Sequence, residues 1–197
     1  TIVCNLFALY LSGSRTAWIP FVVTIPFMFL INKRFIYFTT SMAGIGGAGM
    51  LLLLEPKLMQ RATIFQDFAK RSNIWETAVK GIQAHPLLGK GPLTYFHIYK
   101  QYHGHPTQHA HSIYLDPILS HGIIGVILAG IYFAGNLKEV YLLLKRRIDL
   151  RLFSLISAFI LTILIHGILD YTVYWVQTGL LFLIVLSASS MYFHKEQ

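Results

Sequence analysis

The sequence predicts an all-α integral membrane protein of about six transmembrane helices, the first of them truncated, with a large external loop that bears amphipathic helices. Its composition is 55% hydrophobic and only 12% charged, and its mean hydropathy is +0.57. Both values lie on the apolar side of ordinary soluble domains. Apolar runs that approach the thickness of a bilayer recur along the chain. We therefore treat residues 1–197 as a single membrane domain with an external loop at residues 55–111.

The first apolar run ends at Leu11 and is too short to cross a hydrocarbon core of about 30 Å. It also lacks the basic leader and the small-residue cleavage pattern of a signal peptide. Because position 1 is Thr rather than Met, we expect the chain to be the C-terminal part of a longer polytopic protein.

Five further apolar runs predict whole spans, at residues 18–31, 35–54, 112–134, 152–169 and 173–193. Pro20 and Pro26 interrupt the first, and membrane helices tolerate such kinks when their neighbours satisfy the freed carbonyls. The run at 35–54 has a small-residue face from Gly44 to Gly49, which favours close helix packing.

Basic residues in the short connections predict the orientation of these spans. They are Lys33 and Arg34 in the first turn, Lys138, Lys145, Arg146, Arg147 and Arg151 in a connector at 138–151, and Lys195 in the tail. If every run crosses, all of them lie on one side, which the positive-inside rule assigns to the cytoplasm. The 55–111 loop and the turn at 170–172 then face outward, on the external side of the membrane. The net charge of +8 thus suits lipid or phosphate contacts, and we expect no nucleic-acid partner.

Within the loop, apolar residues recur at three- and four-residue steps, which predicts two short amphipathic helices at the outer membrane surface. These residues are Ile64, Phe65 and Phe68, and then Ile74, Trp75, Ala78, Val79 and Ile82. Ser72 is placed to cap the second helix, and Pro86 should stop it. We interpret Gly89-Lys90-Gly91 as a turn, because the spacing of a phosphate-binding Walker loop is absent.

An ionisable histidine stands where the loop meets the next span. His111-Ser112 is followed by nine residues and then by Gly122-Ile-Ile-Gly125. Other loop histidines, among them His103, His105 and His109, raise a zinc hypothesis. No cysteine accompanies them and the H-E-x-x-H pattern is absent, so we expect solvated histidines and neither metal nor cofactor.

This spacing resembles the H-[NSQ]-x9-G-x-x-[GTY] pattern of bacterial O-antigen ligases and the related O-antigen and capsule polymerases. Further elements resemble that family in the same order: Ser14-Arg15, Arg71 with Trp75, the turn from His85 to Pro92, and His166 with Asp170. Ser120-His121 departs from it, because many relatives have an acidic residue there.

The resemblance implies a GT-C-like membrane glycosyltransferase of polysaccharide biosynthesis. Such an enzyme moves a glycan from an undecaprenyl-diphosphate carrier to a glycan or lipid-linked acceptor hydroxyl, without a required metal. It acts on the external (periplasmic) face of a bacterial plasma (inner) membrane. Departure of the diphosphate builds negative charge that arginine holds well, so Arg15 and Arg71 are the candidates for that role. Arg61 and Lys90 are further candidates for binding the substrate.

The acceptor hydroxyl must lose its proton as it attacks, and histidine suits general-base work near neutral pH. His111 is the candidate base. Because topology places all three on the external face, we expect His111, Arg71 and Arg15 to converge on one external cavity. His166 and Asp170, four residues apart, are expected to share a helix face near the outer end of a span and to contact substrate.

Each candidate has a structural alternative. Arg15 can extend to lipid phosphates, Arg71 can belong to a solvated helix face, and His111 can cap the helix that follows. His166 and Asp170 can form a purely structural hydrogen bond. A polytopic transporter and a structural membrane subunit remain as other function classes, although no internal repeat supports transport. Polymerase and ligase also remain open.

Overall fold

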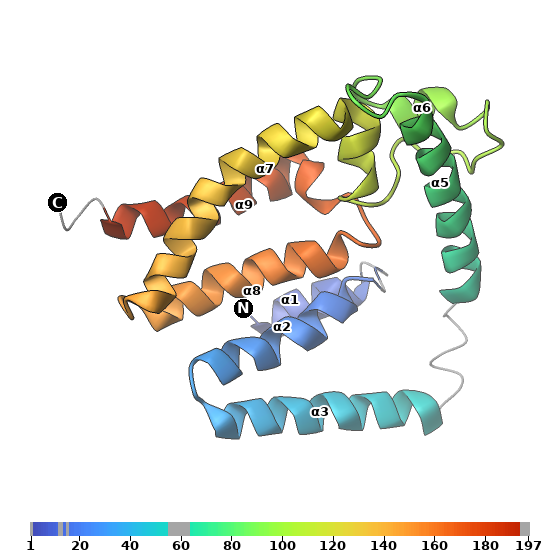
Figure 1. Ribbon diagram of the computed structural model, residues 1–197. Coiled ribbons are helices and arrows are strands. Elements are labelled where there is room, and N and C mark those ends of the chain that lie inside the picture. The colour runs from blue at the N-terminus through green and yellow to red at the C-terminus, as the bar shows by residue number, and fades with distance from the viewer. Residues whose placement is uncertain (1, 12–13, 15, 55–63, 194–197) are drawn as a thin grey trace.

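The computed structural model describes the backbone of residues 2–11, 14, 16–54 and 64–193, and every regular element in these ranges is a helix (Figure 1). In chain order they are α1 (Ile2–Leu11), α2 (Trp18–Ile31), α3 (Phe35–Leu54), α5 (Ile64–Ala84), α6 (Thr94–Ile98), α7 (Leu115–Lys145), α8 (Leu150–His166), the 3-10 turn η1 (Thr172–Tyr174) and α9 (Val176–Phe193). The expected all-helical fold is confirmed for these residues.

Five apolar helices form what we call the bundle: α2, α3, α8, α9 and the part of α7 after Gly122. Among the described helices, α7 has the length and hydropathy of a membrane span, and the other four are shorter apolar helices. Their outward faces carry large hydrophobic side chains, such as Ile36 (76% exposed) and Ile131 (66% exposed). Water penalises apolar surface of this extent, whereas lipid tails do not. The bundle therefore has the surface of a membrane protein.

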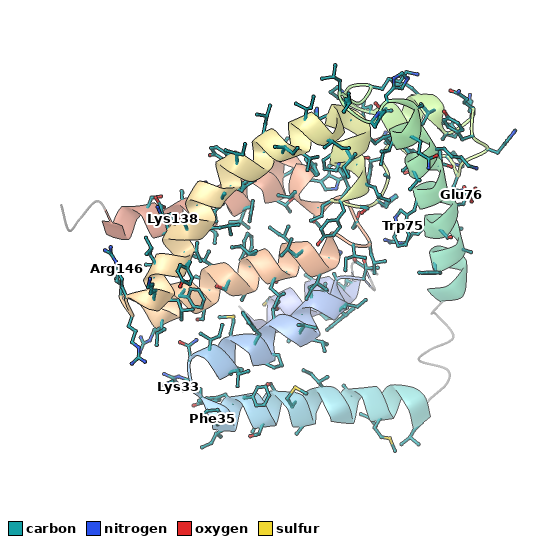
Figure 2. All side chains as sticks on the ribbon, viewed as in Figure 1. Lys33, Phe35, Trp75, Glu76, Lys138 and Arg146 are labelled. Atoms are coloured by element: carbon teal, nitrogen blue, oxygen red, sulfur yellow. The ribbon has the colours of Figure 1, made fainter. Side chains whose placement is uncertain are left out.

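Inside the bundle, α2 packs on α3 and α8, and α7 packs on α8 and α9. A buried cluster of Val140, Leu143, Ile156 and Leu186 joins the last three. The side-chain amide of Asn32 donates to Ser154 Oγ at 2.7 Å and so ties the first turn to α8. Basic residues gather at this end of the bundle, where Figure 2 labels Lys33 in the turn after α2, Lys138 near the end of α7 and Arg146 in the turn after α7.

At the other end, residues 64–122 form what we call the cap. Its helix α5 runs crosswise to α3 and α8 (Figure 1) and packs on α6 and the beginning of α7. The expectation of two short helices here is wrong, because α5 continues through Ser72, which is exposed inside the helix. The apolar stripe keeps its helical spacing across this residue from Phe68 to Trp75, whose rings contact each other, and an exposed serine costs little within a helix. The helix ends at Ala84, two residues before Pro86, as expected.

Helix α7 differs from its prediction in three respects. It begins at Leu115 rather than at residue 112, it absorbs the expected connector as far as Lys145, and it breaks at Gly122 (φ 66°, ψ −177°). The first turns of α7 consequently point in a direction of their own (Figure 1). Asp149 then caps α8 by accepting from the backbone N–H groups of Arg151 and Leu152 at 2.8 and 2.9 Å.

Candidate functional site

The break at Gly122 is filled by the turn that follows α5. A Cβ atom on Gly122 would overlap the carbonyl of Leu87, and one on Gly89 would overlap the carbonyl of Ser120. Both glycines have positive φ, a conformation that other residues adopt only with strain. Four backbone hydrogen bonds join the segments: Lys90 N to Leu119 O (3.3 Å), Gly91 N to Ser120 O (2.9 Å), Ile123 N to Pro86 O (2.9 Å) and Ile124 N to Leu87 O (3.2 Å). Two glycine-containing elements of the sequence thus form one interlock.

This interlock holds the first turns of α7 against the loop between α6 and α7, residues 99–114, which we call the histidine loop. Buried Asp116 accepts the backbone N–H of Ala110 at 2.7 Å, and the side chains of Tyr171 and Ser120 also donate to it. Burial, followed by the charge of Asp116, raises the pKa of Tyr171 to about 12, so its hydroxyl remains a donor. These contacts therefore fix the position of Ala110, the residue between His109 and His111.

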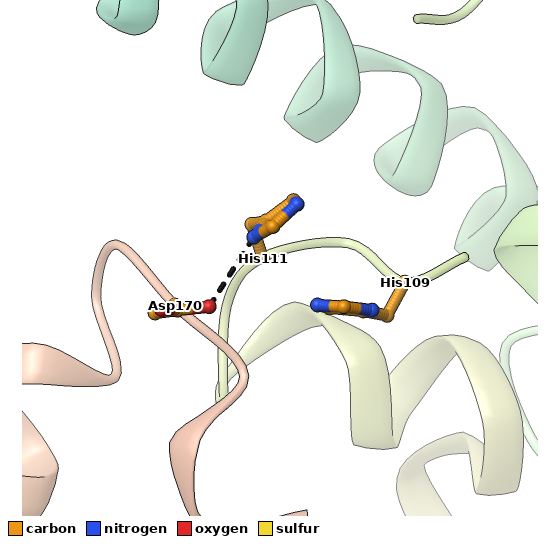
Figure 3. Close-up of side chains that lie close together, drawn as sticks. All are labelled: His109, His111 and Asp170. Atoms are coloured by element: carbon orange, nitrogen blue, oxygen red, sulfur yellow. Dashed lines mark hydrogen bonds and ion pairs between the residues drawn. The ribbon is translucent and has the colours of Figure 1, made fainter. Parts of the chain in front are cut away.

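His111 lies between two hydrogen-bonding partners. Its Nδ1 is 3.3 Å from Asp170 Oδ1 (Figure 3), and its Nε2 is 3.2 Å from Thr107 Oγ1. Burial by itself would raise the pKa of Asp170, but hydrogen bonds from His111 and from the N–H of Tyr171, together with the charges of His111 and His166, lower it to about 2. Asp170 is therefore an ionised carboxylate that orients the imidazole.

Asp170 reaches a second histidine as well. Its Oδ2 is 4.0 Å from His166 Nε2, and the same nitrogen is 3.3 Å from Thr16 Oγ1. The expected shared helix face is wrong, because α8 ends at His166 and Asp170 lies in the turn beyond it. The carbonyl of Gly167 instead accepts the N–H of Ile113 at 2.8 Å, which brings this turn against the histidine loop.

Arg71 and His111 line the same cavity, as the sequence predicted. The cavity measures about 160 Å³, and Lys70, Ile74 and His105 complete its lining. One terminal nitrogen of Arg71 is buried with no hydrogen-bond partner among the described residues, and its guanidinium also acts electrostatically on His166. A buried donor without a partner is costly, and a cavity lined by cationic groups suits an anionic ligand.

Lys90, another candidate from the sequence, does not line this cavity. Lys90 lines a separate cavity of about 90 Å³ with His85 and Thr94. Arg15 and Arg61 lie outside the described residues, although Thr16, the neighbour of Arg15, contacts His166.

His109 was expected to be solvated, and the structure contradicts this. Its ring lies 4.4 Å from the ring of His111, 4.5 Å from that of Tyr171 and 5.6 Å from that of Trp175. Burial, followed by the charge of His111, lowers the pKa of His109 to about 4, although Asp170 opposes the shift. His97 and His103 are exposed, as expected for solvated histidines.

Sequence reasoning passed over two residues that shape this site, Asp116 and Tyr171. Asp116 had a usable signal, because a carboxylate five residues after His111 stands at the start of an apolar run, where such groups are rare and functional. Tyr171 had none, since nothing local distinguishes it from an interfacial aromatic residue.

Comparison with protein families gives one finding. The family model described as O-antigen ligase matches residues 1–130, a segment that includes the Arg71–His111 cavity and the interlock at Gly122 but ends before Asp170. The chain matches no curated protein and no solved structure.

Proposed function

Because this chain belongs to the O-antigen ligase family, we propose that it transfers a glycan from an undecaprenyl-diphosphate carrier to an acceptor hydroxyl on the external face of a bacterial plasma membrane. The proposed architecture is one GT-C-like membrane domain with the cap outside and the basic turns in the cytoplasm. The observation that supports the activity most strongly is His111, oriented by Asp170 at the edge of a cationic cavity that it shares with Arg71.

His111 is the general base in this scheme. Its Nδ1–H donates to Asp170, which leaves the lone pair of Nε2 free to accept a proton. The Thr107 hydroxyl now at 3.2 Å from Nε2 stands where an acceptor hydroxyl would stand. As the acceptor oxygen attacks the anomeric carbon, its proton passes to Nε2, and the bond from that carbon to the diphosphate oxygen breaks. Asp170 stabilises the imidazolium that forms, and the configuration at the anomeric carbon inverts.

Arg71 receives the charge of the departing diphosphate. One nitrogen of its guanidinium is already desolvated and has no hydrogen-bond partner among the described residues, and such preorganised donors stabilise a transition state without reorganisation. Lys70 and His105 add donors in the same cavity. Arg15 is proposed as a second diphosphate ligand and Arg61 as a further one. These cations neutralise the leaving group, so the scheme requires no metal.

A transporter is the principal alternative, and the broken helix α7 is the feature that would suggest one. Transporters use broken helices to expose backbone groups to a substrate cavity. Here the turn at residues 86–91 hydrogen-bonds the backbone freed at Gly122. The break therefore serves to dock the cap rather than to offer a binding site for cargo.

A cellular test separates these functions. The full-length gene is deleted and complemented with wild type, Arg71→Ala, His111→Ala and, as a control, His97→Ala, which alters an exposed histidine of α6. We expect normal membrane levels of all four proteins and surface glycan only with wild type and His97→Ala. Wild-type glycan with His111→Ala would contradict the proposal.

The same deletion strain separates polymerase from ligase. A polymerase extends one lipid-linked glycan with another, whereas a ligase passes the finished polymer to a different acceptor. Accumulation of single lipid-linked repeat units would identify a polymerase, and complete but unattached polymer would identify a ligase. Extraction of the lipid-linked glycans followed by gel electrophoresis gives this result directly.

A further inference from the structure

Three side chains with the chemistry of metal ligands converge at the histidine loop. They are His109, His111 and Asp170, and one potential ligand atom from each lies within 4.8 Å of the others (Figure 3). They come from two segments that are distant in sequence, the loop before α7 and the turn after α8. Two imidazoles and a carboxylate form a donor set suited to Zn²⁺ and related transition metals.

The surroundings leave one nitrogen of His109 without a partner and supply outer contacts to the other two residues. The Nε2 atom of His109 is buried and has no hydrogen-bond partner in the described part of the chain. If His111 carries its proton on Nε2, it donates to Thr107 and offers the lone pair of Nδ1 beside Asp170. Asp170 in turn accepts the N–H of Tyr171 at 2.7 Å. Such second contacts fix the tautomer and orientation of ligands in zinc sites.

Only a small movement would close the site. The Nδ1 of His111 and the Oδ1 of Asp170 are already 3.3 Å apart, about the separation of two ligands whose bonds to zinc are each ~2.0–2.1 Å. The ligand atom of His109 lies within 4.8 Å of the other two, so it must move by about 1–2 Å to join them, within the reach of side-chain rotation. A fourth position can be filled by water, as in open zinc sites.

We propose that His109, His111 and Asp170 form an inhibitory binding site for Zn²⁺ or a similar transition-metal ion. The binding claim stands by itself, and the inhibitory claim rests on the proposed function. In the catalytic tautomer of His111, Nδ1 bears the proton and Nε2 is the base. In the metal-bound tautomer, Nε2 bears the proton and Nδ1 binds the metal. Metal binding therefore removes the lone pair that receives the proton of the acceptor hydroxyl. It also engages the carboxylate that stabilises the imidazolium.

Charge sets the expected strength of this site. Asp170 contributes one negative charge, while Lys70 and Arg71 line the cavity next to His111 and oppose a cation. Binding should thus be reversible and weaker than in structural zinc sites, as a regulatory site requires. Mg²⁺ and Ca²⁺ should not compete, because they prefer oxygen ligands.

Binding is tested on the full-length protein, purified in detergent and freed of metal with EDTA. Calorimetric titration with Zn²⁺ should give one ion per chain. His109→Gln should weaken binding by about tenfold or more, while the control His97→Gln should bind as wild type does. Equal binding by His109→Gln and wild type, or no saturable binding, would overturn the site.

A spectroscopic measurement on the wild type keeps this test decisive if His109→Gln does not fold. Co²⁺ added to the metal-free protein should give visible absorption bands of a low-symmetry protein site, and Zn²⁺ should abolish them. A spectrum identical to that of hydrated Co²⁺ would overturn the proposal.

The inhibitory claim is tested by glycan transfer in the same preparations. Saturating Zn²⁺ should reduce the rate for wild type to about a tenth or less, and EDTA should restore it. His109→Gln should need higher Zn²⁺ for the same effect. Zinc binding without loss of activity would overturn inhibition. If zinc binds and the metal-free protein transfers no glycan, the proposed function fails while the metal site stands.

Discussion

The cap and the bundle bury different kinds of groups. The buried cluster of the cap surrounds Tyr95 and Leu119, and buried polar residues accompany it, namely Thr77, Thr94, Ser112, Asp116 and Ser120. The bundle buries aliphatic residues between its helices and exposes the rest of its apolar surface. Buried polar groups therefore help to fix the conformation of the cap beside its apolar cluster, whereas the bundle relies mainly on apolar contact and buries fewer polar side chains, Thr24, Ser154 and Ser189 among the described residues.

The polar contacts of the bundle, in contrast, are few and lie at helix crossings. Asn32 meets Ser154 between the first turn and α8, and Glu139 of α7 accepts from the hydroxyls of Ser189 and Ser190 in α9. None of these touches the cavity of Arg71. The precise geometry of the molecule is therefore concentrated where the cap meets the adjoining ends of the bundle helices.

The largest effect should follow from breaking the junction between the two regions. Gly122→Ala places a Cβ against the carbonyl of Leu87 at a residue with φ of 66°. We expect a loss of about 3 kcal/mol or more from strain and overlap together. Gly130→Ala is the matched control on the same helix, since its Cβ would meet nothing within 4 Å. Thermal unfolding of both proteins in detergent measures the difference, and equal midpoints would contradict the interlock.

A smaller loss should follow from weakening the support of the histidine loop. Asp116→Asn replaces an acceptor of the Ala110 N–H by an amide, and we expect about 1–3 kcal/mol less stability. The transfer rate should fall about tenfold, because His111 is no longer held in position. Glu76→Gln, which alters an exposed carboxylate paired with Lys80, should leave both quantities unchanged. A normal transfer rate in Asp116→Asn would show that this carboxylate does not hold His111 in position.

Substitution of one buried serine in each region tests the difference between the cap and the bundle. Ser112 Oγ accepts the N–H groups of Tyr114 and Leu115 before α7, and its change to Ala should cost about 1 kcal/mol. The one hydroxyl hydrogen of Ser189 is shared between Leu186 O in its own helix at 2.9 Å and Glu139 of α7 at 3.4 Å. Glu139 keeps Ser190 as a donor when Ser189 is removed, so Ser189→Ala should cost about 0.5 kcal/mol. Denaturant titration measures both. A larger cost for Ser189→Ala would reverse the distinction between cap and bundle.

The smallest effect concerns Lys90. It is exposed and lines a cavity other than that of Arg71, so Lys90→Ala should change the transfer rate by less than about twofold. Steady-state kinetics with lipid-linked donor checks this. A loss comparable to that of Arg71→Ala would place Lys90 at the diphosphate after all.

Sequence patterns predicted the bundle better than the cap, for a physical reason. Apolar runs long enough to approach a membrane's thickness are local properties, so the bundle helices were found with errors only at their ends. Convergence of Arg71 and His111 was also predicted, from topology and the family resemblance. The break at Gly122 was not, because it depends on a turn about thirty residues earlier in the chain. The continuity of α5 through Ser72 was missed because a capping residue outweighed the apolar periodicity.

The central claim is that His111 and Asp170 act as one unit beside Arg71, and a double-mutant comparison of kcat tests it most directly. His111→Ala, Asp170→Asn and the combined variant are purified and assayed with lipid-linked donor and acceptor. When two residues act as one unit, removing the second after the first has little further effect on the rate. We therefore predict that the combined variant is about as slow as His111→Ala alone. A combined loss equal to the product of the two single losses would contradict the account.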